Sequence, residues 1–153
     1  MVTYNNHDIV FQEIPNEVSI AFTIEGCPNN CVGCHSPHLR EQNGDELTIA
    51  LIESILKQYD VTCILFLGGD AFHTELYLIA KHFQSLGYRM AIYSGNDTLD
   101  ERLLDVFMYY KIGSYQSELG GLDSINTNQR LYKYTTKLEN ITREFWNENS
   151  KMG

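Results

Sequence analysis

The residues with the clearest chemical potential are three closely spaced cysteines. Cys27, Cys31 and Cys34 form a C-x3-C-x2-C pattern in the stretch CPNNCVGCH, and His35 follows the third cysteine directly. Thiolates are soft ligands that suit iron–sulfur clusters or zinc. Outside a secretory context, cysteines spaced like this more often bind metal or act in catalysis than form a disulfide framework. This segment is therefore the first candidate for a functional site.

Three interpretations of the cysteine segment are open. A structural zinc site would use His35 or His38, but zinc ligands usually come as two separated pairs, and adjacent Cys34 and His35 close a tetrahedron awkwardly. Three unliganded buried cysteines are not expected on a loop rich in proline, asparagine and glycine. A [4Fe–4S] cluster normally takes four cysteines. With three, one iron would stay open to a substrate or cofactor.

The fourth cysteine, Cys63, lies in the continuous apolar run VTCILFL at residues 61–67. In principle it could supply a fourth thiolate to a cluster. A cysteine in the middle of an apolar strand, however, behaves as a small hydrophobic residue. We therefore predict that Cys63 is buried in the core.

Apolar patterns predict the elements that must position these residues. β-formers alternate in EVSIAFT, and VTCILFL has the length and composition of a strand buried on both faces. Apolar residues at helical spacing predict the intervening helices, the second with Thr74 as N-cap and Gly87 as its stop. The predicted strands are 17–23, 61–67, 88–93 and 112–115, and the predicted helices are 45–59, about 74–87 and about 98–109.

Strands that alternate with helices predict an α/β fold with a mainly parallel sheet and right-handed crossovers. In such sheets the ligand lies at the carboxyl ends of the strands. The predicted strands lead into three polar turns, which are the cysteine segment, GGD at 68–70 and SGN at 94–96. We expect these turns to converge on one edge. A full (β/α)8 barrel needs roughly 200 residues or more, so 153 residues predict a truncated, open βα half-barrel.

Composition and charge limit the partners. The chain is 43% hydrophobic and 20% charged, without repeats or linkers, which predicts one domain over residues 1–153. A net charge of −9 argues against nucleic acid and against an anionic membrane surface. No apolar run approaches the roughly 20 residues of a membrane helix, and the polar start Met1–Asn6 is unlike a signal peptide. These features predict a cytoplasmic protein.

The C-x3-C-x2-C spacing resembles that of the radical S-adenosylmethionine (SAM) superfamily, and Gly68-Gly69-Asp70 resembles its GGE motif. Within that superfamily, the chain is similar to the activating component of the anaerobic (class III) ribonucleoside-triphosphate reductase. Three stretches carry this resemblance, FTIEGCPNNCVGCH, LFLGGDAF and SELGGLDSINTNQRLY, the last at Ser117–Tyr132. The resemblance covers most of the chain and implies the partial TIM-like barrel of radical SAM enzymes.

The resemblance implies an oxidoreductase with one [4Fe–4S] cluster held by Cys27, Cys31 and Cys34. SAM would chelate the open iron through its amino and carboxylate groups, and one-electron reduction would cleave it to methionine and a 5'-deoxyadenosyl radical. In the activase family, that radical abstracts a hydrogen from a glycine of the partner reductase, which then stores a glycyl radical. A one-electron donor such as flavodoxin or ferredoxin would be a second partner. No side chain need act as general acid or base.

The expected SAM site draws on the two glycine-containing turns. Gly68 and Gly69 let the backbone approach a ligand closely. Asp70 supplies an anionic acceptor for the ammonium group of SAM. Ser94 and Asn96 are candidates to bind the ribose or the carboxylate, although both are also ordinary turn residues.

Residues beside the third cysteine complete the predicted site. Gly33 and His35 flank Cys34 and are expected to line the SAM pocket. Many members of the superfamily carry an aromatic residue where this chain has Gly33, so His35 is the candidate for stacking on adenine. The other histidines considered, His38, His73 and His82, are interpreted as solvated or helix-face residues.

Two alternatives remain open at this point. One stays within the superfamily and is an activase of a different glycyl radical enzyme, similar to the activating enzyme of pyruvate formate-lyase (formate C-acetyltransferase), or a small-molecule radical SAM enzyme, although those chains are typically longer. The other is a zinc-binding interaction module without catalysis. Metal analysis separates the two classes, because zinc without sulfide excludes the radical chemistry.

Overall fold

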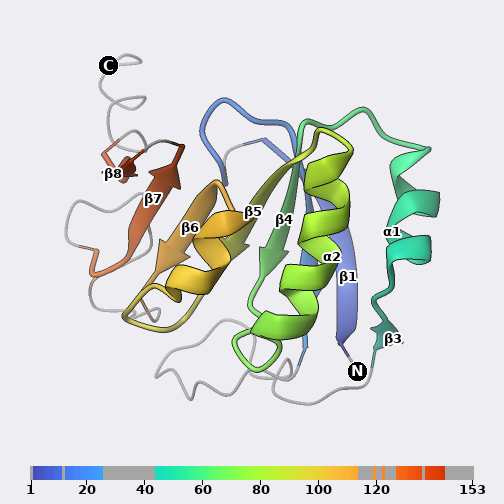
Figure 1. Ribbon diagram of the computed structural model, residues 1–153, viewed down its shortest axis with the longest axis horizontal. Coiled ribbons are helices and arrows are strands. Elements are labelled where there is room, and N and C mark those ends of the chain that lie inside the picture. The colour runs from blue at the N-terminus through green and yellow to red at the C-terminus, as the bar shows by residue number, and fades with distance from the viewer. Residues whose placement is uncertain are drawn as a thin grey trace.

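A mixed β-sheet organises the protein (Figure 1). The computed structural model describes residues 2–11, 13–25, 44–113, 119, 122, 127–135 and 137–143. Within this part of the chain, eight strands lie in the order β3-β1-β2-β4-β5-β6-β7-β8. The strands are β1 Thr3–Val10, β2 Ser19–Ile24, β3 Asp45–Glu46, β4 Cys63–Leu67, β5 Arg89–Tyr93, β6 Tyr109–Ile112, β7 Arg130–Tyr134 and β8 Leu138–Asn140.

The centre of the sheet is parallel, as the alternation of strands and helices predicts. Strand β4 pairs in parallel with β2 and with β5, and β5 pairs in parallel with β6. The outer strands, in contrast, pair antiparallel, with β1 between β2 and β3 on one side and β7 between β6 and β8 on the other. The fold is therefore α/β with a parallel core, and the sheet as a whole is mixed.

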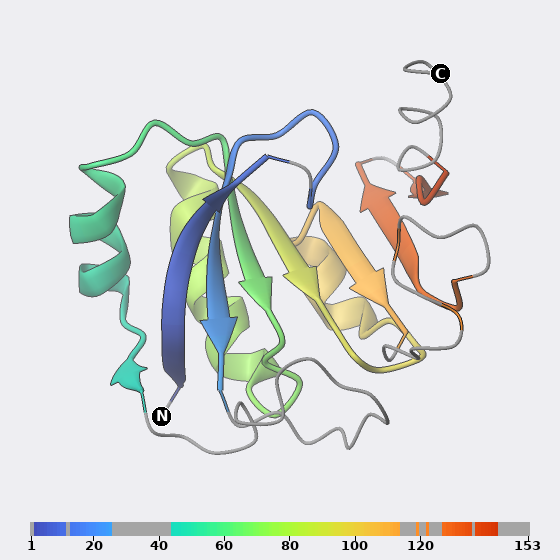
Figure 2. The same cartoon turned by 180° about the vertical axis from the view of Figure 1, so that it is seen from behind.

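Three helical segments accompany the sheet: α1 Ile49–Leu56, α2 His73–Ser85 and the 3-10 helix η2 Glu101–Asp105. Seen from behind, α2 and η2 lie on the far face of the central strands and α1 lies beside β1 (Figure 2). The side chains of all three segments join one apolar cluster with residues of the strands. The helices thus cover one face of the sheet.

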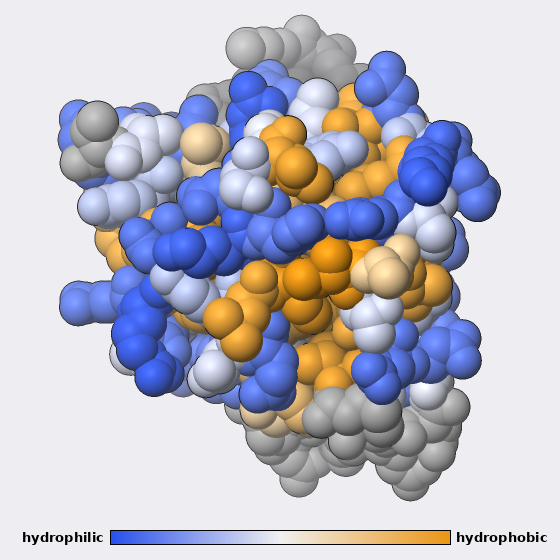
Figure 3. Space-filling view, turned by 45° about the vertical axis from the view of Figure 1, so that its right-hand side comes forward, coloured by the Kyte–Doolittle hydropathy of each residue, from blue (hydrophilic) through white to orange (hydrophobic). Residues whose placement is uncertain are grey.

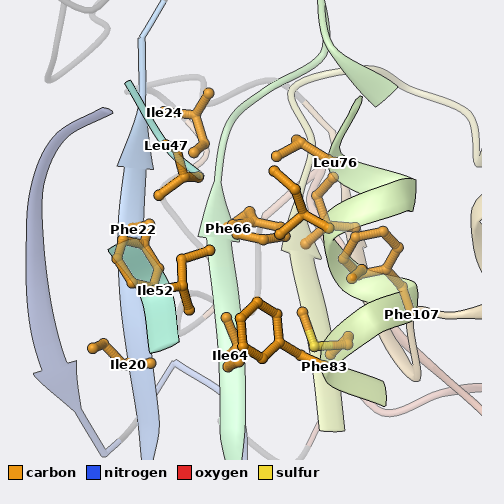
Figure 4. Packing of buried hydrophobic residues seen from close by; sticks show 14 of the residues in the cluster. Ile20, Phe22, Ile24, Leu47, Ile52, Ile64, Phe66, Leu76, Phe83 and Phe107 are labelled. Carbon is orange, nitrogen blue, oxygen red and sulfur yellow. The ribbon is translucent and has the colours of Figure 1, made fainter. Parts of the chain in front are cut away.

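Alternation along the strands divides the buried side chains between two faces. Large apolar residues of β2 and β4 point toward the helices, including Phe22 and Phe66, which are both fully buried (Figure 4). The opposite face carries small residues at the centre of the sheet, Ala21, Cys63 and Ala91. The larger cluster therefore lies between the sheet and its helices, and it anchors the strands whose ends form the site.

The first helix is shorter than the apolar pattern predicts. Asp45 and Glu46 form strand β3 against β1, and the helix begins only at Ile49. Thr48 sets this start because its hydroxyl accepts the Leu51 N–H at 3.1 Å. The predicted start at residue 45 is wrong because pairing with the edge of β1 competes with helix formation.

The second predicted helix is confirmed, with a different start. Helix α2 begins at His73, with Phe72 at the N-cap position and no side-chain cap, so Thr74 is not the N-cap. At its other end the chain turns at Gly87, whose φ of +98° favours glycine. The predicted stop is therefore correct.

The third predicted helix is wrong. Only the 3-10 helix η2 forms in that stretch, capped by the Asp100 carboxylate, and strand β6 occupies Tyr109–Ile112 where the helix was expected to end. The predicted strand at 112–115 shares only Ile112 with β6. Leu103, Val106 and Phe107 are nevertheless buried in the core, as the apolar pattern predicts.

Apolar side chains also gather on the surface of the face that carries α1 and α2 (Figure 3). Leu78 and Leu86 are 62% and 58% exposed there, in and directly after α2. None of the helices in the described residues is long and apolar enough to cross a membrane. Exposed apolar clusters of this kind are common where another protein docks.

Phe66 is the central aromatic residue of the core. Its ring lies 6.4 Å from the ring of Phe22 and 6.1 Å from that of Phe107, so it joins β4 to β2 and to the segment after η2. We expect Phe66→Ala to lower the free energy of unfolding by about 3–5 kcal/mol. The exposed control Leu78→Ala should change it by less than about 0.5 kcal/mol. Urea denaturation of both variants measures this, and equal losses would contradict the assignment of the core.

Candidate functional site

The carboxyl ends of the parallel strands form the candidate site, at the lower edge of the sheet in Figure 1. Thr23 of β2 pairs with Leu67 of β4, and Leu67 pairs with Tyr93 of β5, so the three strands end side by side. The turn after β4 also bonds directly to β5, because the Gly68 N–H donates to the Tyr93 carbonyl at 2.9 Å. The predicted convergence is confirmed for the described parts of these turns.

The cysteine segment leaves the sheet at this same edge. Its predicted site residues, Cys27, Gly33, Cys31, Cys34 and His35, all lie outside the described residues. The residues on either side of it bond to each other and to β1: the Gly44 N–H donates to Glu25 Oε1 at 2.5 Å, and the Glu25 N–H donates to the Thr3 carbonyl at 3.0 Å. The segment therefore departs from and returns to one point beside β2.

The two glycines after β4 differ in what they require. Gly68 and Gly69 have φ values of +91° and +97°, which favour glycine over other residues. A Cβ on Gly69 would lie 2.4 Å from Cδ1 of the buried Leu76, so this side chain of α2 would have to move to admit it. A Cβ on Gly68 would meet only the Ile24 carbonyl oxygen, at 3.4 Å. Close approach of a ligand is therefore a prediction that suits Gly68 better than Gly69.

The Asp70 side chain points into the protein and joins the two turns. It is only 2% exposed. Its Oδ1 accepts the Ser94 hydroxyl at 2.6 Å, and its Oδ2 accepts the Gly95 N–H at 2.9 Å. Burial alone raises the pKa of this carboxyl, but hydrogen bonds from His73, Ser94 and Gly95 outweigh burial, and the pKa is lowered overall. Asp70 is thus a carboxylate that ties GGD to SGN, and its contact with the SAM ammonium group stays a prediction.

Ser94 and Asn96 play different parts in the second turn. Ser94 is completely buried; its hydroxyl donates to Asp70, and the hydroxyl oxygen accepts the Asn96 N–H at 3.0 Å. The Asn96 carbonyl accepts the Gly113 N–H at 2.6 Å, which ties the turn to the end of β6. Within the described residues the side-chain amide of Asn96 has no hydrogen-bond partner. The contact of this amide with SAM stays a prediction.

His73 is a residue of this site that sequence reasoning missed. It lies in α2, but its interpretation as solvated is wrong, because its side chain is only 12% exposed. Nε2 lies 3.1 Å from Asp70 Oδ1, and Nδ1 lies 3.2 Å from Asp100 Oδ2. The signal in the sequence was its position three residues after Asp70 at the start of a helix, where two side chains can meet. His82, in contrast, is on the helix surface, bonded to Glu53 at 2.6 Å.

Asp100 connects His73 to the next element along the chain. It caps η2, and Arg102 binds its two oxygens through Nε at 3.0 Å and a terminal nitrogen at 2.8 Å. The hydrogen bond from Arg102 is the main cause that holds the pKa of Asp100 well below its usual range. A cavity of about 290 Å³ lies beside this pair, lined by His73, Tyr77 and Leu103 among others.

Cys63 is a core residue, as predicted. It is completely buried on the face opposite the helices, and burial raises the pKa of its thiol to about 12. It is the first residue of β4, so the length of the strand separates it from Leu67 by roughly 13 Å. No group of His, Cys, Asp and Glu residues that could hold a metal ion occurs in the described part of the chain.

A second buried carboxylate lies at the opposite edge of the sheet. Glu17 accepts the Thr62 hydroxyl at 2.6 Å and the Tyr109 hydroxyl at 2.9 Å, and Arg89 Nε lies 3.2 Å from it. These partners come from the amino ends of the strands. The arrangement holds the parallel strands together away from the predicted site.

A substitution at Gly69 tests whether packing against Leu76 constrains the turn, and a control separates this packing effect from the cost of a positive φ. Gly87 is a matched control, because its φ is also positive but no atom lies within 4 Å of the Cβ position. We expect Gly87→Ala to cost about 1–2 kcal/mol of unfolding free energy from the left-handed conformation. Gly69→Ala should cost a further 1–3 kcal/mol or so from the clash with buried Leu76. Equal losses in urea denaturation would show that packing does not constrain Gly69.

The Ser94 hydroxyl should contribute stability through the Asp70 carboxylate. Ser94→Ala removes a donor from a buried charged group, for an expected loss of about 1–3 kcal/mol near neutral pH. The control Ser85→Ala removes an exposed helix hydroxyl and should be close to neutral. Because the pKa of Asp70 is lowered in the folded state, the loss should be full above about pH 4 and disappear as the pH falls through the folded pKa. A difference that is independent of pH in acid would contradict this.

Comparison with known proteins agrees with this geometry. Residues 22–144 match the family model of the Radical SAM superfamily, a span that runs from β2 through the cysteine segment and both turns to the end of β8 and just beyond. No curated protein and no solved structure matches the chain significantly. Because the family match covers well over half of the 153 residues, the chain belongs to the radical SAM superfamily, whose members are enzymes that typically use a [4Fe–4S] cluster and SAM.

Proposed function

We propose that this protein is a radical SAM activase that forms a glycyl radical on an anaerobic ribonucleoside-triphosphate reductase. The observation that carries the proposal is the superfamily match across residues 22–144. The matched span includes the three-cysteine segment and the GGD and SGN turns. The Asp70 carboxylate bonds these two turns to each other at the carboxyl ends of the strands. The sequence similarity to the activating component of that reductase supplies the more specific activity.

The donor set fits the proposed cofactors. Cys27, Cys31 and Cys34 would hold the [4Fe–4S] cluster, and three thiolates leave one iron for SAM. When bound, the cluster and SAM together supply one-electron cleavage of the sulfur–C5' bond, which releases methionine and a 5'-deoxyadenosyl radical able to take a hydrogen atom from glycine. Thiolate is the ligand that such clusters prefer, and the segment returns to the sheet edge where the turns lie.

The protein's own residues bind and orient in this proposal. The Asn96 amide, which has no partner among the described side chains, would bind the carboxylate or ribose of SAM. Gly68 would let the backbone come close, since its Cβ position meets only a carbonyl oxygen. Gly33 and His35 would line the pocket beside the third cysteine, with His35 against the adenine. Asp70 and Ser94 would act chiefly by keeping the turns in place, because their polar atoms bond to each other.

The proposed partner is a much larger protein that carries the target glycine. An open half-barrel, which the parallel strands β2, β4, β5 and β6 would form, leaves one side for a glycine loop of the reductase. The exposed apolar side chains around α2 provide a surface of the kind used in docking. Flavodoxin or ferredoxin would deliver the electron.

Cysteine variants give the first test of the cofactor assignment. We expect anaerobically reconstituted wild-type protein to show a reduced [4Fe–4S] EPR signal that changes when SAM is added. Cys31→Ala should abolish the cluster, while Cys63→Ala should keep its iron, sulfide and EPR signal because Cys63 is buried away from the site. Bound zinc without sulfide would contradict the proposal and favour a zinc-binding interaction module.

The activase assignment needs its own measurement. The reduced protein with SAM should generate a glycyl radical EPR signal on an anaerobic ribonucleoside-triphosphate reductase and none on a pyruvate formate-lyase. A radical on the lyase alone would assign the protein to another activase family. Rapid turnover of SAM with a small molecule, in the absence of any protein partner, would contradict an activase role altogether.

A further inference from the structure

We propose that His73 is a positioning residue whose doubly protonated ring holds the GGD turn in the shape that receives SAM, so that loss of one ring proton weakens SAM binding. The inference rests on the proposed function only in taking SAM as the ligand. We call the group formed by Asp70, His73 and Asp100 the histidine bridge.

Both ring nitrogens of His73 face a carboxylate oxygen. Nε2 is 3.1 Å from Asp70 Oδ1, and Nδ1 is 3.2 Å from Asp100 Oδ2. A neutral imidazole has one N–H and one lone pair. Either neutral tautomer would therefore direct a lone pair at a carboxylate oxygen. Only the imidazolium donates to both, and charge-assisted hydrogen bonds of this kind are the stronger ones.

The surroundings of the ring support the charged form. Asp70 faces it from the turn after β4, and Asp100 faces it from the start of η2. Arg102 is the nearby cation, but it is occupied with Asp100, and Tyr77 lies in the same cavity with its hydroxyl donating to Asp105 at 2.7 Å. The Tyr110 hydroxyl, from β6, accepts the Asp100 N–H at 3.2 Å. Two carboxylates thus face one histidine.

The direction of the titration follows from these contacts. The hydrogen bond with Asp70 raises the pKa of His73; partial burial opposes this, and the contact with Asp100 adds to the rise, so the pKa is above its ordinary value. A cavity of about 290 Å³ beside the ring gives its proton access to solvent. The stabilisation from the bridge is therefore full below about pH 6.5 and is lost as the pH rises through the folded pKa.

The bridge acts on the site through Asp70. The same carboxylate oxygen that meets His73 also accepts the Ser94 hydroxyl, and the second oxygen accepts the Gly95 N–H. His73 is the first residue of α2, and Asp100 caps η2. The imidazolium thus fixes the starts of two elements around the turns. Deprotonation removes the histidine's hydrogen bond to one of the two carboxylates, while Ser94, Gly95 and Arg102 keep theirs, and it weakens the tie between the GGD turn and α2.

The first test measures the protonation of the His73 ring directly, on the chain of residues 1–153 without metal. Nitrogen-15 NMR should show both ring nitrogens of His73 protonated below about pH 6.5, with a titration midpoint above that value. A midpoint at or below that value would overturn the bridge whatever the protein's activity is. This result is independent of cluster, SAM and partner, so it separates failure of the bridge from failure of the proposed function.

The second test measures the dissociation constant of SAM on the reconstituted protein across the titration of His73. Wild-type affinity should fall about tenfold as the pH rises, equivalent to about 1.4 kcal/mol. His73→Gln should bind SAM like high-pH wild type at every pH. His82→Gln is the matched control, since it removes a histidine–carboxylate pair from the same helix away from the site, and it should keep the wild-type profile.

The possible results distinguish failure of the positioning role of His73 from failure of the proposed activase function. Wild-type affinity that does not vary with pH, or a His73→Gln profile equal to wild type, would overturn the positioning role and leave the activase proposal standing. A pH-dependent affinity without a glycyl radical on the reductase would support the bridge and contradict the activase. If His73→Gln does not fold, the wild-type profile and the ring titration still decide.

Discussion

The buried carboxylate of Asp70 is the constraint on which the candidate site depends. It lies between two turns that follow different strands, and it accepts hydrogen bonds from a hydroxyl, a backbone N–H and an imidazole. Removing a carboxylate from water is costly unless each acceptor position finds a donor. The sequence supplies those donors at Ser94, Gly95 and His73. The position of the GGD turn relative to the SGN turn follows from that requirement.

Strands β2, β4 and β5 could be predicted because most of their side chains are buried. The runs at 61–67 and 88–93 contain all of β4 and β5, and 17–23 contains most of β2. The outer strands could not be predicted, since β1 contains the polar residues Asn5, Asn6 and Asp8 and is held by pairing with β2. The failure at 98–109 has a different cause. Apolar spacing there located the core correctly, but the same spacing suits a 3-10 turn followed by a strand.

The sequence predicted where the candidate site lies but not which of its side chains bond to each other. Topology alone brought the GGD and SGN turns together, because parallel strands end at a common edge. The sequence did not show that Asp70 and Ser94 bond to each other. His73 was missed because a histidine after a turn is usually solvated. Asp100, whose carboxylate contacts the His73 ring, lies 27 residues away in the sequence, so the sequence did not indicate this contact.

A buried carboxylate joins neighbouring parallel strands both at their amino ends and at their carboxyl ends, but the partners of the two carboxylates differ. At the amino edge, Glu17 gathers Thr62, Arg89 and Tyr109, so one carboxylate joins residues at the starts of β2, β4, β5 and β6. At the carboxyl ends, Asp70 joins the turns after β4 and β5, and the same carboxylate oxygen that accepts the Ser94 hydroxyl contacts the titratable ring of His73. Arginine keeps its charge at all ordinary pH values, whereas histidine does not. The amino edge is therefore fixed, while the edge that would bind SAM can respond to the protonation of a single residue.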